Sequence, residues 1–263
     1  MRLSNKYVVV TGGTSGLGLA MARALLQEGA TVAIAARPGP RLEMMSETLK
    51  TWASRLLCLP MDVRDVQSVE RAREVIAEAW PKLDLVVNNA GIGMRTVNPL
   101  FLTQPQPFFE VDPEGFEDVV RTNLTGYFFV SRAFASLFRR QGYGRFVNVT
   151  MNRETMVRRG FVPYGPSRAG AEAFSYIMVE DLKPFGITVN LLLPGGATRT
   201  GMIPEGTPPE ALARMRDPEI MGPPIVFLAS DAAEGMTGER IDASQWEAWC
   251  QAHGVDREWY AKA

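Results

Sequence analysis

The chain has 263 residues, of which 46% are apolar, so it can form one large α/β domain with an ample core. Its 28 basic and 29 acidic residues leave a net charge of −1, which gives no indication of nucleic acid or an anionic membrane as a partner. The longest apolar runs, such as residues 187–193, are far too short to span a bilayer. A strand is predicted directly after the first six residues, so we expect no signal peptide.

Histidine and cysteine are too rare to support several kinds of site. The single histidine, His253, lies near the end of the chain, which argues against a Ser-His-Asp triad and a histidine-based zinc site, and we predict no metal site. Cys58 and Cys250 are expected to be buried or incidental thiols rather than a disulfide, as in a cytoplasmic protein.

A glycine-rich turn follows the first predicted strand, residues 7–11, and leads into a predicted helix, residues 19–27. Glycines allow the backbone to approach a pyrophosphate, and the start of the helix offers unpaired N–H groups. In this strand–turn–helix context the turn predicts a dinucleotide site. The residues assigned to it are Gly12, Thr14, Ser15, Gly16, Leu17 and Gly18.

The second predicted strand, residues 31–35, ends close to Arg37. In dinucleotide-binding folds an acidic residue here binds the ribose 2′-OH, whereas an arginine accommodates a 2′-phosphate. Arg37 therefore favours NADP(H) over NAD(H), although it is also compatible with a solvated strand end.

The next elements continue a regular alternation. An amphipathic helix is predicted over 41–54, a strand over 56–60, a helix capped by Asp65 that runs to Trp80, and a strand over 83–87. This β-α-β alternation predicts a parallel sheet with helices on both faces.

Tyr164 and Arg168 stand four residues apart at the start of a further predicted helix, so their side chains share one face. A nearby cation stabilises a phenolate, and a phenol in this setting can exchange a proton with a substrate oxygen. The alternative is a half-buried aromatic residue beside a solvated arginine.

The segments 11–18 and 88–91, with Asn123, Tyr164 and Pro194-Gly195, resemble in order and spacing the short-chain dehydrogenase/reductase family. The resemblance covers roughly residues 5 to 242. It implies one Rossmann-like, doubly wound parallel sheet of about seven strands within residues 1–243, followed by an aromatic tail, residues 244–263.

The resemblance also implies roles for individual residues. Tyr164 would be the acid/base, Asn123 would hold a water in a proton relay, and the helix over 116–140 would form a dimer contact. We therefore expect a homodimer or homotetramer. Further cofactor contacts are implied for Asp62, Val63, Asn89, Ala90, Gly91, Pro194, Gly195 and Thr198.

Two positions depart from the family pattern. Met151 stands where the family has serine, and a thioether cannot donate a hydrogen bond; Thr150 or Asn152 is the expected replacement donor. Arg168 stands at the lysine position, where it keeps the charge and the donors for the ribose but does not titrate.

Two loops and the tail are the remaining candidates for specificity. Residues 94–113, rich in proline and phenylalanine, form either a wall for a partly apolar substrate or a loop that packs on the scaffold. Residues 196–218 are expected to be a lid. The tail is expected to dock on a neighbouring subunit or the edge of the pocket.

The sequence therefore predicts an NADP(H)-dependent oxidoreductase that interconverts a carbonyl and an alcohol on a small molecule. Met151 and Arg168 leave two alternatives open. One is a cofactor-binding protein with little redox turnover. The other is a non-redox lyase or isomerase that uses the same tyrosine.

Overall fold

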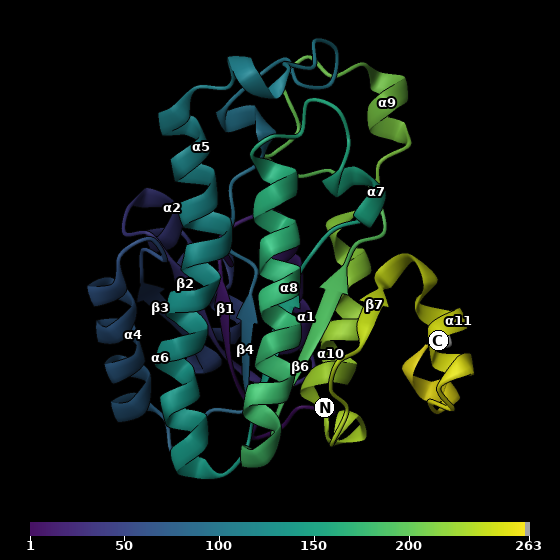
Figure 1. Ribbon diagram of the computed structural model, residues 1–263. Coiled ribbons are helices and arrows are strands. Elements are labelled where there is room, and N and C mark those ends of the chain that lie inside the picture. The colour runs from purple at the N-terminus through teal and green to yellow at the C-terminus, as the bar shows by residue number, and fades with distance from the viewer. Residues whose placement is uncertain (261–263) are drawn as a thin grey trace.

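Seven short strands form one parallel sheet in the computed structural model, which describes residues 1–260 (Figure 1). Their order across the sheet is β3-β2-β1-β4-β5-β6-β7. The strands are β1 (Tyr7–Thr11), β2 (Thr31–Ala36), β3 (Leu56–Pro60), β4 (Leu85–Asn88), β5 (Gly144–Val149), β6 (Ile187–Leu193) and β7 (Arg240–Asp242). The order reverses between β1 and β4, where ligands bind in doubly wound sheets. The predicted fold is confirmed.

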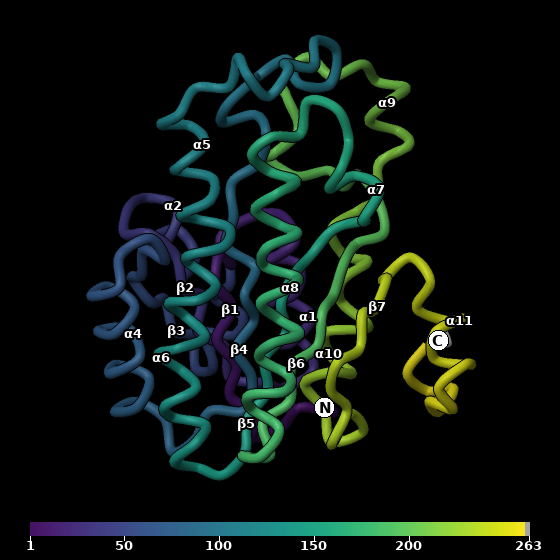
Figure 2. Tube along the Cα trace, in the orientation of Figure 1, coloured from purple at the N-terminus to yellow at the C-terminus, as the bar shows by residue number. Residues whose placement is uncertain are grey.

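Helices cover both faces of the sheet (Figures 1 and 2). One face carries α4 (Val66–Ala79), α5 (Pro113–Val120), α6 (Gly126–Gln141) and α8 (Tyr164–Leu182). The other carries α1 (Gly16–Gln27) and α10 (Gly222–Ala229). Each layer encloses its own buried cluster, because strands that are covered on both faces are apolar throughout.

The helix expected over 41–54 is broken, and that prediction is wrong. The segment forms α2 (Pro40–Glu43), α3 (Met45–Thr48) and a 3-10 turn, Lys50–Arg55. Leu42, Met45 and Leu49 are nevertheless buried on one face, as the amphipathic pattern requires. The backbone leaves helical geometry at Leu49 and at Trp52, close to the start of β3.

The predicted long helix before β5 consists of α5 and α6 joined by a π-helical turn, Arg121–Thr125, which contains Asn123. It begins after Asp112, whose carboxylate accepts a hydrogen bond from the Gly115 N–H. A single π turn within a helix is frequently found at a functional site.

The aromatic tail packs on its own chain, and its expected docking on a neighbouring subunit stays a prediction. Trp246 of α11 (Trp246–Ala252) and Trp259 are buried against Phe227 of α10, with ring centroids 5.4 Å apart in each pair. The Trp246 Nε1–H donates to the Trp259 carbonyl at 3.1 Å. The tail therefore extends the core on the α10 side of the sheet.

Other short helices are α7 (Arg153–Met156) and α9 (Pro209–Ala213). Within residues 1–260, no helix has the length and hydropathy of a bilayer span. The same residues contain no cluster of three or more acidic, histidine or cysteine side chains placed to bind a metal. Cys58 and Cys250 are both free thiols.

Candidate active site

The glycine turn lies against the end of β4. Gly12 has φ +67°, and a Cβ on it would lie 2.8 Å from the Ala90 Cα. A Cβ on Gly18 would lie 2.3 Å from the Gly12 carbonyl oxygen and 2.5 Å from Asn89 Nδ2. Neither position can hold a side chain. This narrow turn at the start of α1 fits a cofactor whose diphosphate is bound by backbone N–H groups.

Thr11 and Asn89 fasten this turn to β4. The Thr11 hydroxyl accepts hydrogen bonds from the N–H groups of Asn89 and Ala90, at 2.9 and 3.0 Å. Asn89 Nδ2 donates to the Thr11 carbonyl at 2.9 Å. The Asn89 side chain therefore holds the backbone of the glycine turn in place. Sequence reasoning did not assign Thr11, whose partners are more than seventy residues away.

The ends of β2 and β3 carry charged groups. Arg37 is exposed, whereas Asp62 forms an ion pair with Arg64, which also binds Asp118. Hydrogen bonds from Arg64 lower the pKa of Asp62, and the charge of Arg37 adds to this effect. Val63 is buried and packs against Gly126 at the start of α6.

Tyr164 and Arg168 lie together at the start of α8, as the four-residue spacing predicts. The Arg168 Cζ lies 5.3 Å from the centroid of the half-buried Tyr164 ring. The guanidinium is buried, at 3% exposure. A Cβ on Gly91 would lie 2.3 Å from Arg168 Nη2, so the cation reaches the end of β4.

Asn123 is fully buried, and its amide fixes the chain after β4. Its Oδ1 accepts from the Ile92 N–H, and its Nδ2 donates to the Ile92 carbonyl, both at 2.9 Å. Nδ2 also donates to the Ser167 hydroxyl at 3.2 Å. The side chain is thus fully engaged by protein groups.

The two candidate replacements for the missing serine differ in their surroundings. The Thr150 hydroxyl donates its proton to the buried carboxylate of Glu172 at 2.8 Å. Arg240 Nε donates to the same carboxylate at 3.0 Å, and its Nη2 donates to the Met151 carbonyl at 2.6 Å. The side-chain amide of Asn152, which precedes α7, makes no hydrogen bond to any residue within 1–260. Sequence reasoning missed Glu172 and Arg240.

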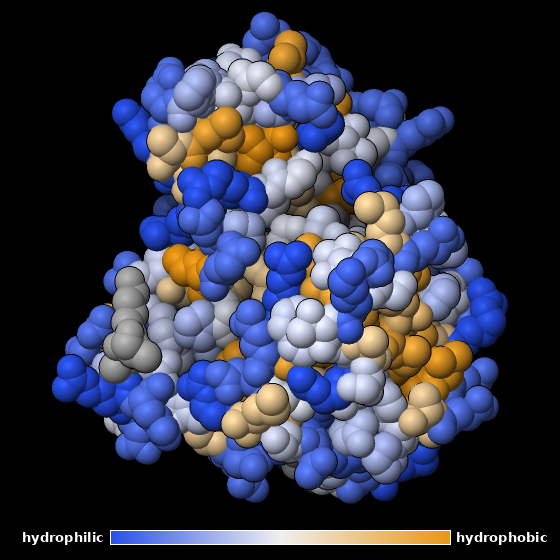
Figure 3. Space-filling model, turned by 180° about the vertical axis from the view of Figure 1, so that it is seen from behind, coloured by the Kyte–Doolittle hydropathy of each residue, from blue (hydrophilic) through white to orange (hydrophobic). Residues whose placement is uncertain are grey.

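An apolar cluster surrounds the tyrosine. Met94 and Phe101, from the loop after β4, pack with Phe161, and Met151 and Tyr164 pack against this group. The Phe101 and Phe161 rings lie 5.8 Å apart, edge to face. Viewed from behind, hydrophobic side chains gather on the upper part of the molecule, above a hollow in its surface (Figure 3). The loop therefore packs on the scaffold beside Tyr164.

The segment after β6 crosses the start of α1. A Cβ on Gly195 would lie 2.1 Å from Asp242 Oδ1, so this position cannot hold a side chain. The preceding residue, Pro194, is buried. Thr198 is buried, and its hydroxyl donates to the Gly196 carbonyl at 3.2 Å. Thr200 instead lies beside Gly16.

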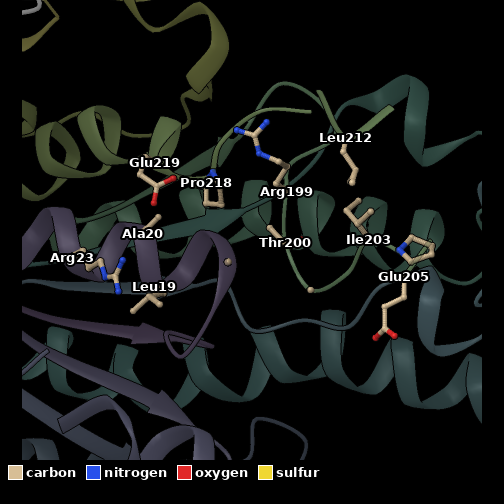
Figure 4. Close-up of a pocket in the computed structure, with 13 residues that line it drawn as sticks. Leu19, Ala20, Arg23, Arg199, Thr200, Ile203, Glu205, Leu212, Pro218 and Glu219 are labelled. Carbon is tan, nitrogen blue, oxygen red and sulfur yellow. The ribbon is translucent and has the colours of Figure 1, made fainter. Parts of the chain in front are cut away.

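A cavity of about 470 Å³ lies between this segment and α1. Figure 4 shows Leu19, Ala20 and Arg23 on one side, with Thr200 and Ile203 across from them. The segment thus approaches the helix that begins at the glycine turn.

Known proteins with related sequences match almost the whole chain. The family model for short chain dehydrogenases matches residues 6–210. The chain is 29% identical over 255 residues to a 3-oxoacyl-[acyl-carrier-protein] reductase of Vibrio harveyi, covering 92% of this chain and 96% of the relative. It is 31% identical over 251 residues to an acetoacetyl-CoA reductase of Rhizobium meliloti, covering 91% and 97%. A 3alpha-hydroxysteroid dehydrogenase of Mediterraneibacter gnavus is 29% identical, with 91% and 95% covered.

Solved structures agree with this assignment. A short-chain type dehydrogenase/reductase from Mycobacterium marinum superposes with a TM-score of 0.78 at 26% identity, covering 93% of this chain and 96% of that one. A dehydrogenase/reductase from Sinorhizobium meliloti gives 0.77 at 27% identity, covering 91% and 94%. The chain belongs to the short-chain dehydrogenase/reductase family and is an NAD(P)-dependent oxidoreductase of that family.

Proposed function

We propose that the protein interconverts a carbonyl and an alcohol with NADP(H), and that Tyr164 is the acid/base. The observation that carries this proposal is the packing of the Tyr164 ring against the buried Arg168 guanidinium, at 5.3 Å. Both side chains lie at the ends of β4 and β5, next to a glycine turn that fits a diphosphate. A phenol beside a permanent cation can release a proton, because its phenolate is stabilised.

In the reductive direction the Tyr164 hydroxyl donates its proton to the substrate oxygen. The bound nicotinamide cofactor supplies the hydride that the substrate carbon receives. Arg168 stabilises the resulting phenolate and stays charged throughout, because a guanidinium does not deprotonate in proteins. Tyr164 recovers its proton from solvent, with the backbone of Asn123 as the proposed site of a relay water.

Asn152 is the proposed second donor to the substrate oxygen. Its amide is not engaged by residues 1–260, whereas the Thr150 hydroxyl is committed to Glu172. A missing donor to a developing oxyanion lowers a rate by about 10²–10³. If Asn152 does not reach the oxygen, the protein binds its cofactor but turns over slowly, which is the second candidate function.

The proposed preference for NADP(H) depends on Arg37. This exposed side chain follows β2, where a 2′-phosphate binds in such folds, and Asp62 nearby is neutralised by Arg64. The other proposed cofactor contacts are those of the glycine turn, with Val63, Ala90, Gly91, Pro194, Gly195 and Thr198. Thr198 contributes through its backbone, because its hydroxyl is bound to Gly196.

The proposed substrate is small and partly apolar. The names of the relatives refer to 3-oxoacyl, acetoacetyl and hydroxysteroid compounds, and a steroid or a long acyl chain joins an oxygen function to an apolar body. The cluster around Met94 and Phe101 suits such a body.

The proposed assembly is a homodimer or homotetramer in the cytoplasm. On α6 and α8 the side chains of Phe128 and Ile177 are exposed, at 45% and 59%, and we propose that a second copy of the chain covers them.

A substrate panel tests the proposed function. Ketones, 3-oxoacyl thioesters and ketosteroids are incubated with NADPH and, separately, with NADH, and the loss of reduced cofactor is followed by absorbance. We expect at least one carbonyl class to oxidise NADPH, and to oxidise NADH more slowly. Tight NADPH binding with no oxidation across the panel would favour the second candidate.

A further inference from the structure

A buried tyrosine that no motif assigns lies one turn beyond Asn123. Tyr127 belongs to α6 and is 2% exposed. Its hydroxyl donates to the Val149 carbonyl at 3.1 Å, at the end of β5, and accepts a hydrogen bond from Arg168 Nη1 at 2.7 Å. One hydroxyl therefore connects α6, β5 and the arginine of α8.

The guanidinium is oriented by this contact. Arg168 Nη1 also donates to the Val149 carbonyl, at a longer 3.2 Å. The Cζ lies 5.5 Å from the Tyr127 ring centroid and 5.3 Å from that of Tyr164, so both phenol rings lie close to the cation. Its other terminal nitrogen, Nη2, is directed at Gly91 beside the proposed cofactor site.

The two phenols do not have the same task. Burial raises the pKa of Tyr127, and the nearby charge of Arg168 only partly offsets this. Tyr127 is therefore a neutral hydroxyl that gives its hydrogen to Val149 and its lone pair to Arg168. It can hold the guanidinium in place, but it does not exchange protons with a substrate.

We propose that Tyr127 is a positioning residue that adapts this site to arginine, by holding the Arg168 guanidinium so that one edge faces the cofactor and one face supports Tyr164. A lysine ammonium is a compact charge with no plane to orient, so the Tyr127 hydroxyl has this role only when residue 168 is arginine. The inference takes its ligand, NADPH, from the proposed function, but it does not require the protein to turn over a substrate.

A double-mutant cycle tests the inference on the full chain. NADPH dissociation constants are measured by fluorescence titration for the wild type, Tyr127→Phe, Arg168→Lys and the double variant. Urea unfolding of the cofactor-free proteins gives a second cycle. The phenylalanine keeps the ring that fills the interior and removes only the hydroxyl. Tyr143→Phe makes the same chemical change at a tyrosine that is 38% exposed.

We expect Tyr127→Phe to weaken NADPH binding by roughly tenfold when residue 168 is arginine and by less than about twofold when it is lysine. The unfolding equilibrium should show the same dependence on residue 168, and Tyr143→Phe should leave both measurements near the wild-type values. Equal effects of Tyr127→Phe in both backgrounds would overturn the inference. The unfolding cycle needs neither turnover nor cofactor, so it remains decisive if the proposed function fails.

Discussion

At the scale of residues, Met151 follows β5 where the family resemblance implies a serine that would polarise the substrate oxygen. Met151 brings an apolar side chain to the ring of Tyr164, while its own carbonyl is bound by Arg240. Because the adjacent Thr150 hydroxyl is bound to Glu172, the strand end offers no hydroxyl to the substrate. The proposed chemistry therefore depends on Tyr164 and on the side-chain amide of Asn152.

Restoring the serine tests this account of the strand end. Because Asn152 is the proposed donor, Met151→Ser should change kcat for simple ketones by less than about tenfold. Met44→Ser, at an exposed methionine far from the site in sequence, is the control. Steady-state NADPH oxidation measures both variants. Asn152→Ala should lower the rate by about 10²–10³, and a rise of about 10- to 100-fold for Met151→Ser would contradict this account, because it would mean that Asn152 does not supply the donor.

Contacts between site residues were predictable from the sequence only where the two partners lie close together along the chain. The four-residue spacing of Tyr164 and Arg168 on a helix gave their contact directly. The partners of Arg168, in contrast, come from α6 and β5, so the bond to Tyr127 could not be foreseen. Thr150 was a reasonable donor until the fold placed Glu172 beside it.

At the scale of elements, the glycine turn is fixed by the close approach of two strand ends. Gly18→Ala would place a methyl group 2.3 Å from the Gly12 carbonyl and 2.5 Å from Asn89 Nδ2. We expect a loss of about 1–3 kcal/mol in the free energy of unfolding, because backbone would have to move. NADPH binding should weaken in parallel.

Urea denaturation and a binding titration measure these two effects. Gly201→Ala is the matched control, since a Cβ there has no neighbour within 4 Å. If Gly18→Ala were as stable as this control and bound NADPH normally, the turn would not have the tight geometry described above.

Element types followed well from apolar patterning, and the errors have physical causes. The strands are short apolar runs, and the segments between them have the apolar periodicity of helices. This alternation was sufficient to predict a parallel sheet. The segment over 41–54 kept its buried face at Leu42, Met45 and Leu49 but not its helical backbone. Such a pattern reports which side chains face the core and does not exclude a break between turns.

At the scale of the whole molecule, the tail contributes to the core on the α10 side. Trp246 is 7% exposed and packs on Phe227. Trp246→Ala should lower the free energy of unfolding by about 3–5 kcal/mol, as expected for a large side chain removed from a packed interior. Trp52→Ala, at a half-buried tryptophan, should cost less. Equal losses in chemical denaturation would show that the tail does not pack as described.

The proposed assembly can be tested on the α6 and α8 surface. Ile177→Glu places a charge among exposed apolar side chains that include Phe128, so it should shift a dimer or tetramer to smaller species. Light scattering after gel filtration measures the mass. Val75→Glu, at an exposed valine of α4, is the control. A wild-type monomer, or an Ile177→Glu protein of unchanged mass, would refute this interface.

The central claim is that Tyr164 exchanges the proton with the substrate oxygen while Arg168 stabilises its phenolate. The most direct measurement is the single-turnover rate of NADPH oxidation by a carbonyl identified in the panel, for wild type and Tyr164→Phe. Both complexes are preformed at saturating NADPH. We predict that Tyr164→Phe binds NADPH within a few-fold of the wild type but loses at least about 10² in rate, as expected when a positioned acid is removed. A Tyr164→Phe enzyme that turns over at the wild-type rate would contradict the account.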